Sequence, residues 1–144
     1  MIVPIQVTFD CADPDRLARF WADLLGYQLD PPPEGYDSWD TWLIEHGIPE
    51  SEWNSAEAVI DPEGRGPRLF FQRVPEQKEV KNRVHLDVNV GGPRGTPEEE
   101  RRTAVDAAVE RAIGLGATKV RFVEEGGERH YVMNDIEGNE FCLQ

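Results

Sequence analysis

The sequence of 144 residues repeats one order of predicted elements twice, and this repeat limits the fold more than any other feature. Each half begins with alternating apolar and polar residues, as in a strand with one buried face. A segment with apolar residues at helical spacing follows, and then shorter strand-like runs, a turn and a final strand. Such a repeat indicates two similar modules that share a sheet.

The first half begins with a predicted strand over residues 5–10 and continues with a predicted helix. Asp13 is suited to accept hydrogen bonds from the first helical amides, and Pro14 suits the first helical position. Gly26 is suited to end the helix in a left-handed conformation. The helix has one apolar stripe, which consists of Leu17, Phe20, Trp21, Leu24 and Leu25.

The second half repeats this order, with a predicted strand over residues 84–90 and a helix after a loop rich in Gly and Pro. Thr96 and Glu99 have the spacing of a capping box, with Pro97 at the first helical position. The apolar stripe of this helix consists of Val105, Ala108, Val109, Ala112 and Ile113. Gly116 follows its end, as Gly26 follows the first helix.

Similar turns, at residues 61–64 and 135–138, precede the final strands of the two halves, residues 68–74 and 140–144. We therefore predict an α+β fold in which the order β-α-β-β-β occurs twice. Because each helix has a single apolar stripe, it covers one face of a sheet and leaves the other face free to line a binding site. A sandwich with no function on that face fits the same pattern.

Charge and composition exclude several classes of partner. With 15 Lys and Arg against 28 Asp and Glu, the net charge is −13, the wrong sign for binding nucleic acid or an anionic membrane surface. No stretch approaches the roughly 18 apolar residues of a membrane span, and the first residues lack a basic segment. Cys11 and Cys142 have no metal or redox spacing. We expect a cytoplasmic protein with two reduced thiols.

Short motifs spread over nearly the whole chain carry a resemblance to a known superfamily. They are VTFDCADP (residues 7–14), FW (20–21), LLGY (24–27), LFFQ (69–72), NRVHLDV (82–88) and DIEGNEFCL (135–143). Their order resembles the glyoxalase-like domain proteins of the vicinal oxygen chelate superfamily, which includes glyoxalases and bleomycin resistance proteins. The resemblance implies a single domain over residues 1–144, built from modules at roughly 1–76 and 80–144. It also implies a cupped mixed sheet around a small-molecule cavity, helices on the outer face, and a homodimer.

The resemblance also places four candidate ligand positions on the first and last strands of the modules. By position these are Gln6, Gln72, His85 and Cys142. The metal-dependent members have His and Glu at these places, and only His85 matches. Gln is a weak neutral ligand, and one His with one Cys falls short of the three protein ligands usual at catalytic zinc. We therefore predict no metal site and no cofactor.

Other candidate residues come from their position on the predicted strands. Thr8 and Asp87 lie on the polar side of their strands, as do Gln6 and His85, so we place them among the ligand-binding residues. His85 is suited to acid/base catalysis near neutral pH or, alternatively, to a structural hydrogen bond with a neighbour such as Asp87. Trp42 belongs to an aromatic segment suited to a flat or hydrophobic ligand. If Trp39 and Trp42 lie on one strand, they face opposite ways and only one of them lines the cavity.

Three functions remain open on this basis. The first is a small-molecule-binding protein of the bleomycin-resistance type that needs no metal. The second is a lyase or isomerase in which His85 moves a proton, or which uses an unusual metal site. The third, an interaction module, has no sequence feature in its favour beyond the expected homodimer. The missing metal-type residues favour the first.

Overall fold

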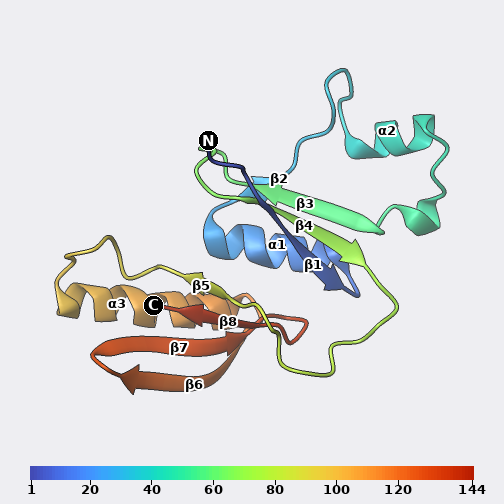
Figure 1. Ribbon diagram of the computed structural model, residues 1–144. Coiled ribbons are helices and arrows are strands. Elements are labelled where there is room, and N and C mark those ends of the chain that lie inside the picture. The colour runs from blue at the N-terminus through green and yellow to red at the C-terminus, as the bar shows by residue number, and fades with distance from the viewer. The chain divides into compact units, whose positions relative to one another are not determined.

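The computed structural model describes residues 1–144, and the chain divides into two compact units, Met1–Gln77 and Lys78–Gln144 (Figure 1). Each unit contains one four-stranded sheet and one long helix. In both units the first strand and the long helix come first and three strands follow. The α+β fold with two βαβββ modules, predicted from the repeat, is confirmed.

The first unit contains one sheet, the long helix α1, and a helical segment between the second and third strands (Figure 1). Its elements are β1 (Gln6–Cys11), α1 (Pro14–Leu25), β2 (Gln28–Leu29), α2 (Trp39–Glu45), a 3-10 helix (Glu50–Glu52), β3 (Ala56–Ile60) and β4 (Arg68–Arg73). The strands lie in the order β1-β4-β3-β2. Strands β1 and β4 are parallel, and the other pairs are antiparallel.

The second unit has the same topology without the additional helical segment. Its elements are β5 (Leu86–Val88), α3 (Glu98–Gly114), β6 (Thr118–Glu125), β7 (Glu128–Asn134) and β8 (Glu140–Leu143). The order β5-β8-β7-β6 corresponds strand for strand to that of the first sheet, with a parallel first pair. None of the helices combines the length and apolar character needed to cross a bilayer.

Helix α1 begins and ends where the sequence predicts. The Asp13 side chain accepts a hydrogen bond from the Arg16 amide at 3.2 Å, and Gly26 has a left-handed φ of 73°. Its apolar side chains pack against β3 and β4 and form most of the core of the first unit. Trp21 and Phe71 are fully buried there, because bulky side chains on the helix meet bulky side chains on the sheet.

Helix α3 differs from its prediction at the N-terminus. Pro97 stands just before the helix with an extended ψ of 142°, and no side chain caps the first turn. The Thr96 hydroxyl instead donates to the Pro93 carbonyl at 2.7 Å, so the predicted capping box does not form. Of the predicted apolar stripe, Val105, Val109 and Ala112 are buried. Ile113 remains 40% exposed.

The two predicted turns form with the same construction. Asp61 accepts hydrogen bonds from three backbone amides, those of Glu63, Arg65 and Gly66. Asp135 accepts from two, those of Glu137 and Asn139. An Asp side chain that binds amides further along the chain fixes a tight turn. Strands β4 and β8 therefore start from equivalent anchors, which supports the repeat seen in the sequence.

The first strand of each module is shifted or shorter than predicted. Strand β1 covers residues 6–11 in place of 5–10, and β5 covers only 86–88 in place of 84–90. Val84 is 79% exposed and lies outside the sheet. Both strands lie at a sheet edge and have one hydrogen-bonded neighbour, so the alternating pattern alone does not set their length.

Candidate functional site

The first sheet has one face covered by α1 and one open face. Leu69 and Phe71 of β4 are buried with α1, so the residues between them point the other way. The register of β1 and β4 places three pairs on this open face: Gln6 with Arg68, Thr8 with Phe70, and Asp10 with Gln72. The polar side of the predicted first strand therefore lies opposite the helix, as the alternation indicates.

Gln6 and Gln72, two of the candidate ligand residues, have partners within this face. Arg68 donates to the Gln6 side-chain oxygen at 2.7 Å. The same guanidinium forms an ion pair with Asp30 through two nitrogens, at 3.0 and 2.7 Å. Gln72 donates to the Asp10 carboxylate at 2.8 Å. Both glutamines thus serve as members of side-chain networks across the strands.

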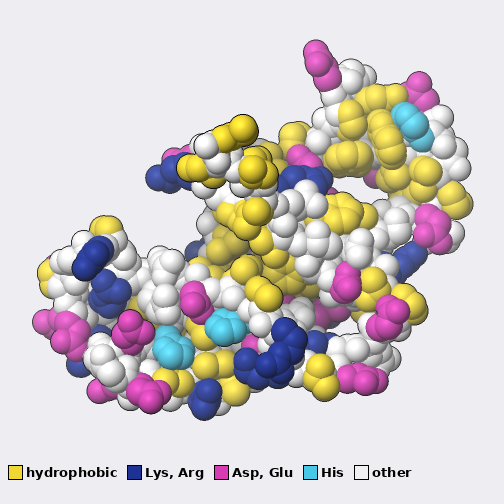
Figure 2. All heavy atoms as spheres, viewed as in Figure 1, with side chains coloured by type: hydrophobic (Ala, Val, Ile, Leu, Met, Phe, Trp, Pro, Cys, Tyr) yellow, Lys and Arg dark blue, Asp and Glu magenta, His cyan; other side chains and the backbone are white.

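A pocket of about 320 Å³ lies between this open face and the α2 segment. We call it the tryptophan pocket; its lining comprises Asp30, Trp39, Trp42, Leu43, Ile48, Glu52, Trp53, Ser55, Ala56, Glu57, Ala58, Arg68 and Phe70. Hydrophobic side chains gather over the α2 region in the space-filling view (Figure 2). Most of the lining residues are aromatic or aliphatic. Among the polar ones, Glu57 accepts a hydrogen bond from the Ala58 amide, and burial raises the pKa of its carboxyl group.

Trp39 and Trp42 lie on helix α2, so the expectation that they face opposite ways on a strand is wrong. Residues three apart on a helix lie on the same side. The two rings meet edge to face at 5.7 Å, and both line the pocket. Ser38 caps this helix by accepting from the Thr41 amide at 3.2 Å. Trp42 also stacks on His46, with ring centroids 4.1 Å apart.

The indole N–H groups of Trp39 and Trp53 are used within the chain. Trp39 donates to the Asp30 carbonyl at 2.8 Å, and Trp53 donates to the Ile48 carbonyl at 3.0 Å. These bonds fix the orientation of both rings. The Arg68 guanidinium lies 5.5 Å from the centre of the Phe70 ring. The pocket thus presents ring faces, and its strongest hydrogen-bond donors already have acceptors.

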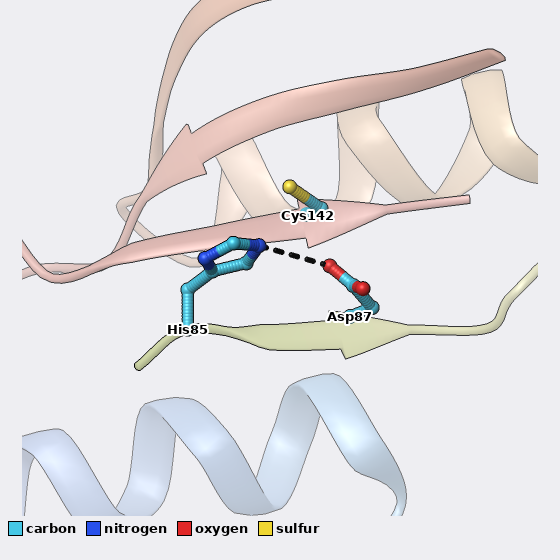
Figure 3. Close-up of side chains that lie close together, drawn as sticks. All are labelled: His85, Asp87 and Cys142. Atoms are coloured by element: carbon cyan, nitrogen blue, oxygen red, sulfur yellow. Dashed lines mark ion pairs between the residues drawn. The ribbon is translucent and has the colours of Figure 1, made fainter. Parts of the chain in front are cut away.

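Three side chains lie close together at the edge of the second sheet: Asp87 on β5, Cys142 on β8, and His85 directly before β5 (Figure 3). Asp87 and Cys142 are register partners on β5 and β8 and share a face of the sheet. His85 Nε2 lies 3.4 Å from Asp87 Oδ1, and one donor atom from each residue lies within 4.8 Å of the others. We call this group the His85 cluster.

The Cys142 thiol is protonated at neutral pH. Burial raises the pKa of Cys142 to about 11, and the charge and hydrogen bond of Asp87 act in the same direction. Lys81 and Arg121 oppose this shift. Because the thiolate is the nucleophile and the metal ligand, Cys142 is poorly suited to attack a substrate unaided.

The registers show that Gln72 and Cys142 do not occupy equivalent positions. Cys142 pairs with Asp87 two residues after His85, and the matching pair in the first sheet is Phe70 with Thr8. Gln72 corresponds instead to Gln144, which donates to Asn89 at 2.9 Å as Gln72 donates to Asp10. The first unit therefore has a phenylalanine, Phe70, which cannot bind a metal, at the place where the second has the Cys142 thiol.

The His85 cluster supplies an imidazole, a carboxylate and a thiol, which are donor types that zinc accepts at a site with three protein ligands. The residues thus fit such an ion in number and chemistry, once the thiol loses its proton. Asp87 is a third donor beside the one His and one Cys that the sequence indicates. The signal for it lies in the strand register, which the sequence does not specify.

Comparison with known proteins assigns the family. Residues 6–144 match the sequence profile of the glyoxalase-like domain. The chain belongs to this family. No curated protein matches the glyoxalase-like chain in sequence.

Solved structures with the same fold share little sequence with this glyoxalase-like protein. A variant of the fosfomycin resistance protein FosX from Listeria monocytogenes, complexed with Mn(II) and 1S,2S-dihydroxypropylphosphonic acid, has a TM-score of 0.63 and 14% identity, covering 100% of this chain and 90% of FosX. A glyoxalase/bleomycin resistance protein/dioxygenase family enzyme from Burkholderia phytofirmans has a TM-score of 0.60 and 17% identity over 96% and 94% of the two chains. The bleomycin-binding protein from Streptomyces verticillus, complexed with copper(II)-bleomycin, has a TM-score of 0.55 and 16% identity over 100% and 96%.

Proposed function

We propose that this protein binds a flat, largely apolar small molecule in the tryptophan pocket. The observation that carries the proposal is a volume of about 320 Å³ with three tryptophans and Phe70 in its lining, on the open face of the first sheet. Ligand sites are typically concave and aromatic, with few polar groups. The bleomycin-binding relative, solved with its ligand, supports a binding role for the fold.

The contacts within the pocket support a flat ligand without a strong anionic group. The indole N–H groups of Trp39 and Trp53 donate to backbone carbonyls. The Arg68 guanidinium already donates to Asp30 and Gln6. The faces of the aromatic rings remain available for contact with a ligand, and they favour offset or edge-to-face packing with another ring. An anion would have to compete with Asp30 for the guanidinium.

Binding is favoured over catalysis because the pocket holds no pair of groups arranged for proton transfer. Of its three acidic residues, Asp30 and Glu52 form ion pairs with Arg68 and Arg73, and Glu57 accepts a hydrogen bond from the Ala58 amide. Gln6 and Phe70 stand where the second unit has His85 and Cys142. Neither side chain titrates near neutral pH.

The test is tryptophan fluorescence and thermal unfolding of the full chain with quinoline and 2-naphthol, and with decahydro-2-naphthol as a ligand of similar size that is not flat. Quinoline and 2-naphthol are expected to quench fluorescence and to raise Tm, whereas decahydro-2-naphthol does neither. Ligand at 100 times its Kd stabilises by about 2.7 kcal/mol. Trp42→Ala should remove both effects.

A matched control is available on the same helix. Ile44 is 66% exposed and does not line the pocket, so Ile44→Ala should bind as the unmodified chain does. Equal binding by the Trp42→Ala and Ile44→Ala variants would place the ligand elsewhere. Absence of any shift with all flat molecules would count against the proposed function itself.

A second candidate function is a lyase or isomerase that uses His85, and the observation in its favour is the His85 cluster. A bound zinc ion would supply a Lewis acid, and His85, Asp87 and Cys142 would hold it. Elemental analysis of the purified, untagged protein tests this. Stoichiometric zinc that is lost in the His85→Ala variant would support it, and a metal content unaffected by that change would refute it.

We further propose that the protein acts in the cytoplasm as a homodimer, without nucleic-acid or membrane partners. Neither cysteine forms a disulfide, which fits a reducing compartment, and the net charge of −13 disfavours polyanions. Size-exclusion chromatography with light-scattering detection measures the mass of the protein in solution. A mass of one chain at micromolar concentration would refute the dimer. The prediction that both units enclose one cavity stays a prediction.

A further inference from the structure

The second unit contains a cavity of its own, of about 330 Å³, between α3 and the β6–β7 hairpin. We call it the α3 cavity. Its lining comprises Thr96, Glu98, Arg101, Arg102, Val105, Asp106, Phe122, Gly127, Glu128, Arg129, Tyr131 and Gln144. Tyr131 pairs with Leu143, and its hydroxyl donates to Asp106 of α3 at 3.0 Å. Because Cys142 points away from Leu143, this cavity lies on the opposite face from the His85 cluster.

Three arginines line this cavity in a chain of strongly negative charge. Arg102 pairs with Glu98 on the same helix, and Arg129 Nε lies 2.9 Å from Glu124. Arg101 forms no ion pair, although it is only part-exposed. Two of the acidic side chains in the lining are engaged, Glu98 with Arg102 and Asp106 with Tyr131. Glu128, also in the lining, is exposed at the hairpin end of the cavity.

Arg129 is incompletely satisfied within the chain. Its Nε and Nη1 atoms are buried and have no hydrogen-bond acceptor, because the contact with Glu124 lacks hydrogen-bond alignment. Buried donors of this kind are rare and costly in native proteins, and a bound anion or water commonly satisfies them. An anion in the cavity would give the guanidinium an acceptor that the chain does not supply, after a small movement of the side chain.

The remainder of the wall next to Arg129 is aromatic. The Arg129 guanidinium lies 4.9 Å from the centre of the Phe122 ring, and Phe122 lies 4.9 Å from Tyr131. Phe122 remains 42% exposed, although the residue pairs across the sheet. Val105 adds an aliphatic surface from α3. A ligand here thus meets cationic donors and apolar ring surface side by side.

We propose that the α3 cavity binds a small aromatic carboxylate, with its anionic group against Arg101 and Arg129 and its ring against Phe122. A carboxylate accepts two hydrogen bonds from one guanidinium, and charge-assisted bonds of this kind are the strong ones. The cavity volume accommodates a single ring with its substituent. This site is separate from the tryptophan pocket, so the two proposals stand or fall independently.

Titration of the isotope-labelled full chain with benzoate, followed by two-dimensional amide NMR, tests the site. Saturable shifts are expected in residues 96–106 and 122–131. Benzyl alcohol has the same ring without the charge, and inorganic phosphate has charge without a ring. Both should bind at least about tenfold more weakly than benzoate, because each loses one half of the contact.

Variants separate a specific site from general charge attraction. Arg101→Gln should weaken benzoate binding about tenfold, and addition of Arg129→Gln should abolish it. Arg94 is exposed and outside the cavity, so Arg94→Gln makes the same charge change and should bind as before. Trp42→Ala should also leave benzoate binding unchanged.

Three results would overturn the proposal. They are equal affinity for benzoate and benzyl alcohol, equal affinity of the Arg101→Gln and Arg94→Gln variants, and amide shifts confined to the first unit. If the Arg129 change prevents folding, Arg101→Gln alone decides, since Arg101 has no ion pair whose loss would disturb the fold.

Discussion

The two units have the same strand order, but their helices cover their sheets to different degrees. Helix α1 buries seven of its 12 residues, whereas α3 buries three of its 17. The buried side chains of α1 include Leu17, Phe20 and Trp21, and those of α3 are only Val and Ala. Small side chains leave space between the helix and the sheet, and the α3 cavity lies there. One topology thus places a cavity on the open face in one unit and beneath the helix in the other.

The largest expected difference between the two units is in the free energy of unfolding lost when a core side chain is truncated. Trp21→Ala in α1 should lower the free energy of unfolding by about 3–5 kcal/mol, because it removes a fully buried ring. Val109→Ala in α3 should cost about 1.5–2 kcal/mol for two buried methyl groups. Urea unfolding measures both. Equal losses would show that α3 packs as tightly as α1.

The second largest expected effect is a difference in stability between variants of the two Asp turns. Asp135 is buried and also accepts two contacts from the Asn139 side-chain amide, whereas Asp61 is less buried. Asp135→Ala should therefore destabilise by about 2–3 kcal/mol and Asp61→Ala by about 1–2 kcal/mol, since buried amides left without an acceptor are costly. Chemical denaturation with matched m-values checks this order. The reverse order would mean that the Asp61 side chain contributes more to stability than Asp135 does.

The Cys142 thiol should show its raised pKa in its reactivity. With Cys11→Ser as background, alkylation at pH 8 should be slow, and its rate should rise until pH reaches about 11, the pKa of this thiol. Asp87→Asn should speed alkylation at pH 8 several-fold, because the carboxylate raises this pKa. Folding favours the protonated thiol, so stability should fall as pH rises from about 9 towards 11. A rate plateau below pH 9 would contradict the assignment.

The smallest expected effect compares equivalent hydrogen bonds. Gln72 donates to a carboxylate, Asp10, and Gln144 donates to a neutral amide, Asn89. Double-mutant cycles should give a coupling energy of about 0.5–1 kcal/mol for the first pair and less for the second, because both are exposed and only one is charge-assisted. A larger value for the Gln144 pair would break the equivalence of the two registers.

Local signals made much of the fold predictable. Asp13, Pro14 and Gly26 define α1 through contacts within a few residues, and the Asp turns are equally local. The α2 segment was missed because its seven residues are too few to show a helical period, although Ser38 carries an N-cap signal. Asp87 as a third donor depends on which residues β5 and β8 bring opposite each other. The α3 cavity depends on the sizes of side chains on both α3 and the β6–β7 hairpin, so the sequence of either segment alone does not predict it.

Residues 30–55, which contain α2, connect β2 and β3, whereas Gly126 and Gly127 alone connect the corresponding strands β6 and β7. Most aromatic walls of the tryptophan pocket therefore come from a connection and only Phe70 from a strand. Exchange of this connection for another would change most of the walls of the tryptophan pocket while leaving every strand pairing in place. The strand pairing and the chemistry of the pocket wall can therefore change independently of each other.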